Sequence, residues 1–192
     1  MKKSNSKDQL LDTAARLFFP NGYRAIGVDT IAAESGIGKM TLYRHYESKD
    51  ELIVAYLRDS DTKFWEEFDK ITGGVESPRQ KLIAFFQALA EYVSQPACFG
   101  CPFLNVAAEY PDPHYPGHQV ALQHKESVRQ RFYELAKQAG VRQPQVLADQ
   151  LFLLMDGTYM TARMYGPKNP AKHLVEAVNT LIDSQLNQAE NL

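Results

Sequence analysis

The stretch VDTIAAESGIGKMTLYRHYESK, residues 28–49, decides the fold. Its apolar spacing predicts two short helices, and Ser35-Gly36 predicts a tight turn between them. The second helix is expected to run from about Lys39 to Tyr46. Two short helices joined by a glycine turn are typical of a helix-turn-helix.

The two sides of this second helix differ in chemistry. At 3.6 residues per turn, Leu42 and Tyr46 share the face that packs inward. The remaining positions carry hydrogen-bond donors, cations and one apolar group: Lys39, Met40, Thr41, Tyr43, Arg44 and His45. A face without an acidic residue suits a major groove lined with phosphates. By the angles alone, a polar face that is only solvated is an equally open interpretation.

Residues from about Asp8 to Leu52 resemble the DNA-binding domain of TetR-type transcriptional regulators. The matching features are Phe18-Phe19, Asn21-Gly22-Tyr23, Ile31-Ala32 before the Ser35-Gly36 turn, the run Thr41–Tyr46, and Ser48-Lys49. Several spaced matches are more specific than one short motif. The resemblance implies a regulator, most often a repressor, that a small-molecule effector releases from a palindromic operator.

The resemblance also implies which residues meet double-stranded DNA. It places Lys39, Met40, Tyr43 and Arg44 near base edges. It places Thr41, Tyr43, His45 and Lys49 near phosphates, and Thr30 adds a further contact. The chain departs from the family at Gly27, Val28 and Gly38, where relatives usually have hydroxyl residues.

Composition allows this interpretation. The 192 residues include 44% apolar side chains, enough for a sizeable core, and carry a formal net charge of −2. Residues 1–50 have a net charge of +2 and residues 51–192 of −4, which is the sign expected for a DNA-binding N-terminus. The sequence has no run of eighteen apolar residues, so it predicts no membrane span, and its first residues lack the apolar stretch of a secretory signal. The sequence therefore predicts a cytoplasmic protein.

The whole chain is predicted to be all-α, with about nine helices and no strand-like alternation. A three-helix helix-turn-helix domain is expected over 1–49 and a C-terminal helical bundle for effector binding and dimerisation over 50–192. Ser48 with Glu51 predicts a capping box at the start of the fourth helix. Outside the motif, helices are expected at about 7–19, 48–71, 77–95, 102–109, 118–139, 144–165 and 170–187.

The last two helices, residues 144–187, carry more apolar surface than one small body can bury. A subunit interface explains this excess, and the family resemblance implies a four-helix dimer bundle at the same place. We therefore expect a symmetric homodimer whose two heads contact a near-palindrome.

The middle of the chain is rich in large apolar side chains, which form either plain core or the lining of an effector pocket. The family resemblance implies a cavity, and the candidate lining residues are Trp65, Phe68, Phe86, Phe103, Asn105, Glu109, His118, Phe152, Met155 and Tyr159. The three polar candidates, Asn105, Glu109 and His118, are either polar groups of this pocket or loop-capping residues. Effector binding would then shift the dimer away from the DNA-bound arrangement, with the fourth helix as the lever. The effector itself is not identified by the sequence.

Cys98 and Cys101 form a CxxC pair that allows three interpretations: reduced thiols, a redox switch, or a metal site with nearby histidines. No second pair follows at zinc spacing, so no metal and no cofactor are expected. No nucleophile elbow or phosphate loop supports an enzyme, and a thiol- or His-dependent enzyme is the least favoured alternative. A protein-binding adaptor is the remaining alternative to a DNA-binding regulator.

Overall fold

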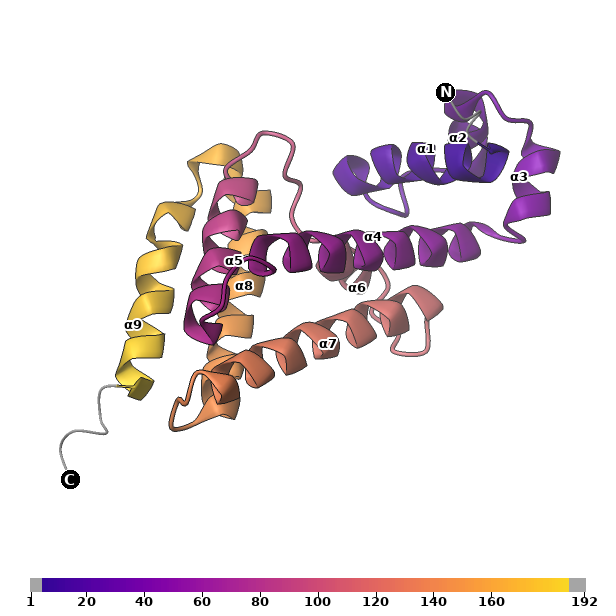
Figure 1. The fold of residues 1–192 in the computed structure, drawn as a ribbon. Helices are drawn as coiled ribbons and strands as arrows, with labels where there is room; N and C mark the ends of the chain where they lie inside the picture. The colour runs from indigo at the N-terminus through magenta and orange to yellow at the C-terminus, as the bar shows by residue number, and fades with distance from the viewer. Residues whose placement is uncertain (1–4, 187–192) are drawn as a thin grey trace. The chain divides into compact units, whose positions relative to one another are not determined.

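The computed structural model describes residues 5–186, which fold into nine α-helices and two short 3-10 turns without any strand in that range (Figure 1). The all-α prediction is confirmed. Residues 1–4 and 187–192, including residue 187 of the expected last helix, lie outside the described part.

The contacts divide the chain into two compact units. Unit 1 combines the residues up to Lys63 with Pro102–Gln123, and unit 2 combines Phe64–Cys101 with the residues from His124 onward. The division falls within two long helices, α4 (Lys49–Thr72) and α7 (Pro116–Gln138), so each contributes to both units.

The first three helices of unit 1 form a small head. They are α1 (Ser6–Asn21), α2 (Val28–Ser35) and α3 (Lys39–His45). Leu10, Ile31 and Leu42, one from each helix, are completely buried, and Tyr46 is 2% exposed. Burial of such side chains contributes about 1.5–3 kcal/mol each, so these apolar positions hold the three helices together.

Glycines and caps set the boundaries of the head helices. Gly36 has φ +67°, in the left-handed region, and ends α2 as a C-cap. Gly27 and Gly38 precede α2 and α3 without a side-chain cap. Ser48 Oγ accepts a bond from the Glu51 amide at 3.1 Å, as the capping box requires. The Glu51 carboxylate, however, accepts from the amide of Glu47.

Unit 2 is built around α5 (Pro78–Val93), α8 (Pro144–Tyr165) and α9 (Leu174–Leu186), with α5 packed against both others (Figure 1). Its core is aromatic. Phe85 lies 5.2–5.5 Å, between ring centroids, from Phe68, Phe86 and Phe132. Phe86 and Phe132 are completely buried, so replacing either by alanine should cost about 3–5 kcal/mol.

The expected last helix starts later than the sequence suggested. Gly166–Lys168 and Pro170–His173 form 3-10 turns, and α9 begins only at Leu174. Asn169 accounts for the interruption, because its amide donates to the Val93 carbonyl at 2.8 Å while its oxygen accepts from the Ala171 amide. The remaining helix, α6 (Pro102–Glu109), has its expected bounds.

Candidate nucleic-acid interface

The exposed side of α3 carries the residues that the sequence singled out. Met40 is 89% exposed and Tyr43 is 43% exposed, whereas Leu42, on the opposite side, is completely buried. Arg44 is exposed, and its Nη2 donates to Thr41 Oγ1 at 3.4 Å along the helix. Met40, exposed on this short helix, does not pack in the core of the head.

Lys39, at the start of the same helix, forms an ion pair in this structure. Its Nζ lies 2.8 Å from Asp29 Oδ1 in the first turn of α2. The hydrogen bond to Asp29 raises the pKa of Lys39, so the side chain stays fully cationic at neutral pH. Both side chains are largely exposed, so the pair stabilises the fold little.

The predicted phosphate contacts lie around this face. Thr30 is exposed on α2, and Thr41 is half-buried on α3. The His45 ring is hydrogen-bonded through Nε2 to Ser6 Oγ at 2.7 Å, so it bridges α3 to the first turn of α1. Ser6 is 39 residues away from His45, and no local sequence pattern points to this pair.

Lys49 begins α4 at the edge of the head. It is half-buried, and this burial lowers the pKa of its ammonium group, against the opposing attraction of Asp50 and Glu109. A partly desolvated cation at a helix N-terminus gains more from an anion than one in open water, because the free amides of the first turn add to the attraction.

Family models cover most of the chain. The model described as bacterial regulatory proteins, tetR family, matches residues 10–56, and that described as Tetracyclin repressor-like, C-terminal domain, matches residues 78–178. The second match alone spans more than half of the sequence. The chain belongs to the TetR family. It is therefore a DNA-binding transcriptional regulator, and the helix-turn-helix at residues 28–45 is its DNA-binding motif.

Individual transcriptional regulators are similar to this chain over about four-fifths of its length or more. A regulator from Streptomyces coelicolor, SCO4454, superposes with a TM-score of 0.90 at 29% identity, covering 94% of this chain and 95% of its own. The regulator YjdC of Escherichia coli K12 is 27% identical over 79% of this chain and 80% of its own length. The repressor KstR2 of Mycolicibacterium smegmatis is 25% identical over 87% of this chain and 82% of its own length.

The residues expected to line an effector pocket are divided between the two units of this TetR-family protein. Phe103, Asn105, Glu109 and His118 belong to unit 1. Trp65, Phe68, Phe86, Phe152, Met155 and Tyr159 belong to unit 2.

Within unit 2 these residues differ in burial. Phe68, Phe86 and Met155 lie inside the core, whereas Phe152 and Tyr159 pack against it and are partly buried. Burial raises the pKa of the Tyr159 phenol well above its usual value, so the hydroxyl stays protonated.

Two of the unit 1 candidates have specific partners. The Glu109 carboxylate accepts from the backbone amides of Tyr23 and Arg24 at 2.9 and 2.7 Å. His118 Nδ1 donates to the Tyr110 carbonyl at 2.9 Å. Glu109 lies 86 residues from Tyr23 in sequence, so only the fold brings them together.

Cys98 and Cys101 are buried, at 5% and 3% exposed, and no disulfide joins them. Burial raises the pKa of the Cys98 thiol, against the opposing effect of the Gly100 amide. A higher pKa reduces the thiolate fraction, and the thiolate is the form that oxidants attack. The described residues contain no cluster of three or more His, Cys, Asp or Glu that could hold a metal ion, and none of their helices could cross a membrane.

Proposed function

We propose that two copies of this chain bind a palindromic DNA duplex, each placing α3 in the major groove. The exposure of Met40 and Tyr43 beside Arg44, on a face that carries no acidic residue of its own helix, supports this proposal most directly. The N-terminal α-helical heads of such dimers contact half-sites about 10 base pairs apart or a little more.

The individual roles follow from side-chain chemistry. Arg44 suits a bidentate pair to a guanine, and Met40 suits the methyl group of a thymine, with Lys39 and Tyr43 also near base edges. Thr30, Thr41, Tyr43, His45 and Lys49 would contact phosphates, which position the head without adding sequence information.

The second copy would dock on α8, which carries an uncovered apolar stripe. Val146, Leu153, Met160 and Met164 are 42%, 69%, 41% and 70% exposed. With Gln150 and Gly157 between them, the positions 146, 150, 153, 157, 160 and 164 alternate steps of four and three residues, the spacing of a helix-pairing seam. Gly157 costs about 1 kcal/mol in a helix relative to alanine, which a close approach of a second helix would offset.

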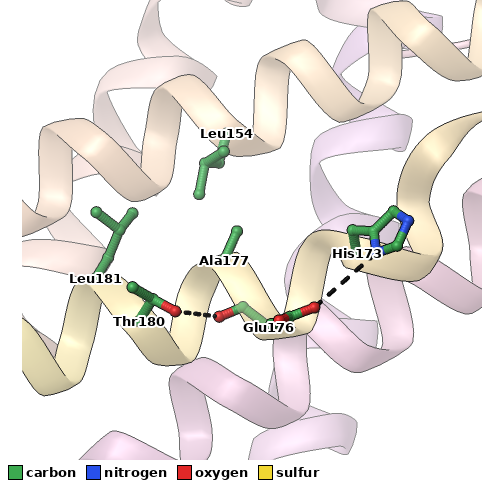
Figure 2. A pocket seen from close by; sticks show the side chains of 6 residues that line it. All are labelled: Leu154, His173, Glu176, Ala177, Thr180 and Leu181. Carbon is green, nitrogen blue, oxygen red and sulfur yellow. Dashed lines mark hydrogen bonds and ion pairs between the residues drawn. The ribbon is translucent and has the colours of Figure 1, made fainter.

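The neighbouring helix α9 offers a complementary surface. A shallow groove of about 490 Å³ lies between Leu154 of α8 and the small side chains Ala177 and Thr180 of α9 (Figure 2). Leu154 and Leu181 point into this groove from its two sides (Figure 2). Large side chains of the partner's α8 stripe would fill it.

The effector would bind in unit 2, where a charged pair lies among aromatic rings. Lys125 Nζ lies 2.5 Å from Asp156 Oδ1, and about 6 Å from the ring centroids of Phe152 and Tyr159. Both charged side chains are at least four-fifths buried. A small molecule with an aromatic or apolar body suits such surroundings, and α4, which contributes to both units, would transmit its binding to the head.

The regulator would act as a repressor without catalytic activity, working in the cytoplasm where its DNA target lies. The similarity to KstR2, which is named as a repressor, and the match to the repressor-like C-terminal domain support this direction of control. No structural observation favours the redox alternative, because burial makes the Cys98 thiolate harder to form.

A single pair of variants tests the dimer and the DNA contact together. Leu153→Glu places a charge in the α8 stripe, and Leu122→Glu places the same charge on an α7 leucine that is 53% exposed. We expect Leu153→Glu to sediment as a monomer and to lose operator affinity, whereas Leu122→Glu sediments as a dimer and binds normally. A wild-type protein that sediments as a monomer and binds duplex DNA one chain at a time would refute the proposal.

A further inference from the structure

Unit 1 contains, besides the head and the start of α4, a distant stretch of the chain, Pro102–Gln123, which we call the insert segment. The chain leaves unit 2 after Cys101, forms α6 and the start of α7 in unit 1, and returns to unit 2 at His124. Any displacement of unit 2 residues at either junction therefore acts on a segment that is packed with the head.

The first contact of the insert segment holds the turn between α1 and α2. Glu109 ends α6, and its two carboxylate oxygens accept separately from the amides of Tyr23 and Arg24, at 2.9 and 2.7 Å. Such charge-assisted bonds are roughly twice as strong as neutral ones. The fit is close, because a Cβ at Gly22, which has φ +87°, would lie 2.7 Å from Glu109 Oε1.

Further contacts reinforce this one. The buried Tyr23 hydroxyl donates to the Pro102 carbonyl at 2.8 Å, and the Arg24 guanidinium lies 4.8 Å from the centroid of the Tyr110 ring. Tyr110 stacks on Tyr115 with centroids 4.1 Å apart and planes 8° from parallel. The Tyr115 hydroxyl in turn donates to Asp50 Oδ1 at 2.9 Å, in the first turn of α4.

We propose that Glu109 is a positioning residue for DNA binding, which fixes the orientation of the helix-turn-helix through the amides of residues 23 and 24. The insert segment forms hydrogen bonds on both sides of α2 and α3, with the turn before α2 and with the start of α4. Glu109 forms the bonds nearest to α2. Removing the Glu109 carboxylate leaves α3 intact but lets α2 and α3 rotate together, so the distance between the two heads of a dimer is no longer fixed. The inference rests on the proposed paired-head binding.

The experiment measures how operator affinity depends on the distance between half-sites. A palindromic duplex selected from random sequence is compared with versions that carry one or two inserted or deleted central base pairs. We expect the wild type to prefer one spacing by at least about tenfold, since two rigid heads must meet successive grooves. For Glu109→Ala we expect this preference to fall below about threefold, with unchanged affinity for a single half-site. Glu109→Gln, which keeps one acceptor oxygen, should be intermediate.

Two control variants separate positioning from charge and from stability. Glu126→Gln removes a carboxylate at an exposed position of α7, and Ile31→Val weakens the buried core of the head. Both should keep the wild-type spacing preference. Hydrogen exchange should show faster exchange at the amides of residues 23 and 24 in Glu109→Ala, with α3 unchanged.

The two possible failures are distinct. A Glu109→Ala protein with the wild-type spacing preference overturns the positioning role alone. A wild type without any spacing preference overturns the paired-head proposal, and this inference with it.

Discussion

Replacing Asp29 by asparagine should strengthen DNA binding, because the Asp29 carboxylate forms an ion pair with Lys39, a side chain that would otherwise contact DNA. Lys39 Nζ lies 2.8 Å from Asp29 Oδ1, and the Asp29 side chain is 82% exposed beside the α3 face. In Asp29→Asn, Lys39 is released and one negative charge per head is removed from the contact surface. The fold should be unaffected, since an exposed pair contributes little to stability.

The size of the effect follows from counterion release. Lys39, once released, can neutralise one phosphate beside the base edges that it approaches, and each phosphate so neutralised steepens the plot of log affinity against log salt by about 0.9, hence about 1.8 for the two heads of a dimer. Between about 50 and 200 mM salt, the affinity of Asp29→Asn relative to wild type should therefore change by about twelvefold, with the larger advantage at low salt.

The assay is a fluorescence anisotropy titration of one labelled duplex at several salt concentrations. Glu34→Gln is the matched control, because it breaks another exposed ion pair of α2, with Arg16 at 2.9 Å, and removes the same charge. As a second control, adding Lys39→Gln to the Asp29→Asn variant should abolish most of the gain in DNA affinity. If Glu34→Gln steepens the salt dependence equally, or if the gain persists without Lys39, the argument from the ion pair is wrong.

Three further predictions concern other residues. Arg44→Ala should reduce the binding free energy by about 1–3 kcal/mol for operators with the preferred base pair at one position, and little for other sequences. Lys49→Ala should weaken binding to all sequences alike and reduce the salt slope by about 1 per head. Equal losses on all sequences for both variants would contradict the assigned roles. Gly22→Ala should destabilise the protein by about 2 kcal/mol, because of its φ of +87° and the contact with Glu109, and lower the melting temperature by about 4–8 °C. Peroxide at a dose that oxidises exposed thiols should leave operator affinity unchanged in both wild type and Cys98→Ser, since burial raises the pKa of the Cys98 thiol. A loss of operator affinity in the wild type alone would instead support a redox switch.

The helix-turn-helix could be predicted from the sequence because local signals define it. The left-handed Gly36 ends α2, and the buried side chains Leu42 and Tyr46 lie four residues apart, about one helical turn. The exposed face of α3 followed from the same periodicity, and the exposures of Met40 and Tyr43 agree with it.

The tertiary contacts around the site could not be predicted in this way. His45 and Ser6 are 39 residues apart, and Glu109 and Tyr23 are 86 residues apart, so no local period relates them. Glu109 was expected either as a polar group of an effector pocket or as a loop-capping residue, and the sequence did not decide between the two. Only the fold shows that it caps two backbone amides of the head.

The start of the last helix was missed for a related reason. The helical spacing of Leu174, Val178 and Ile182 predicted a helix, which was expected to begin at about residue 170. Asn169 instead bonds to the carbonyl of Val93, which lies 76 residues earlier, and 3-10 geometry continues as far as His173. A tertiary hydrogen bond thus overrides a local helix signal.

Chemical protection of guanine N7 atoms, which lie in the major groove, tests most directly whether α3 is inserted there. A selected duplex is treated with dimethyl sulfate with and without the protein. We predict two protected clusters, centred about one helical turn or slightly more apart, with the protection at one guanine of each cluster lost in Arg44→Ala. Tight binding that leaves every N7 in the site as reactive as in free DNA would contradict the account.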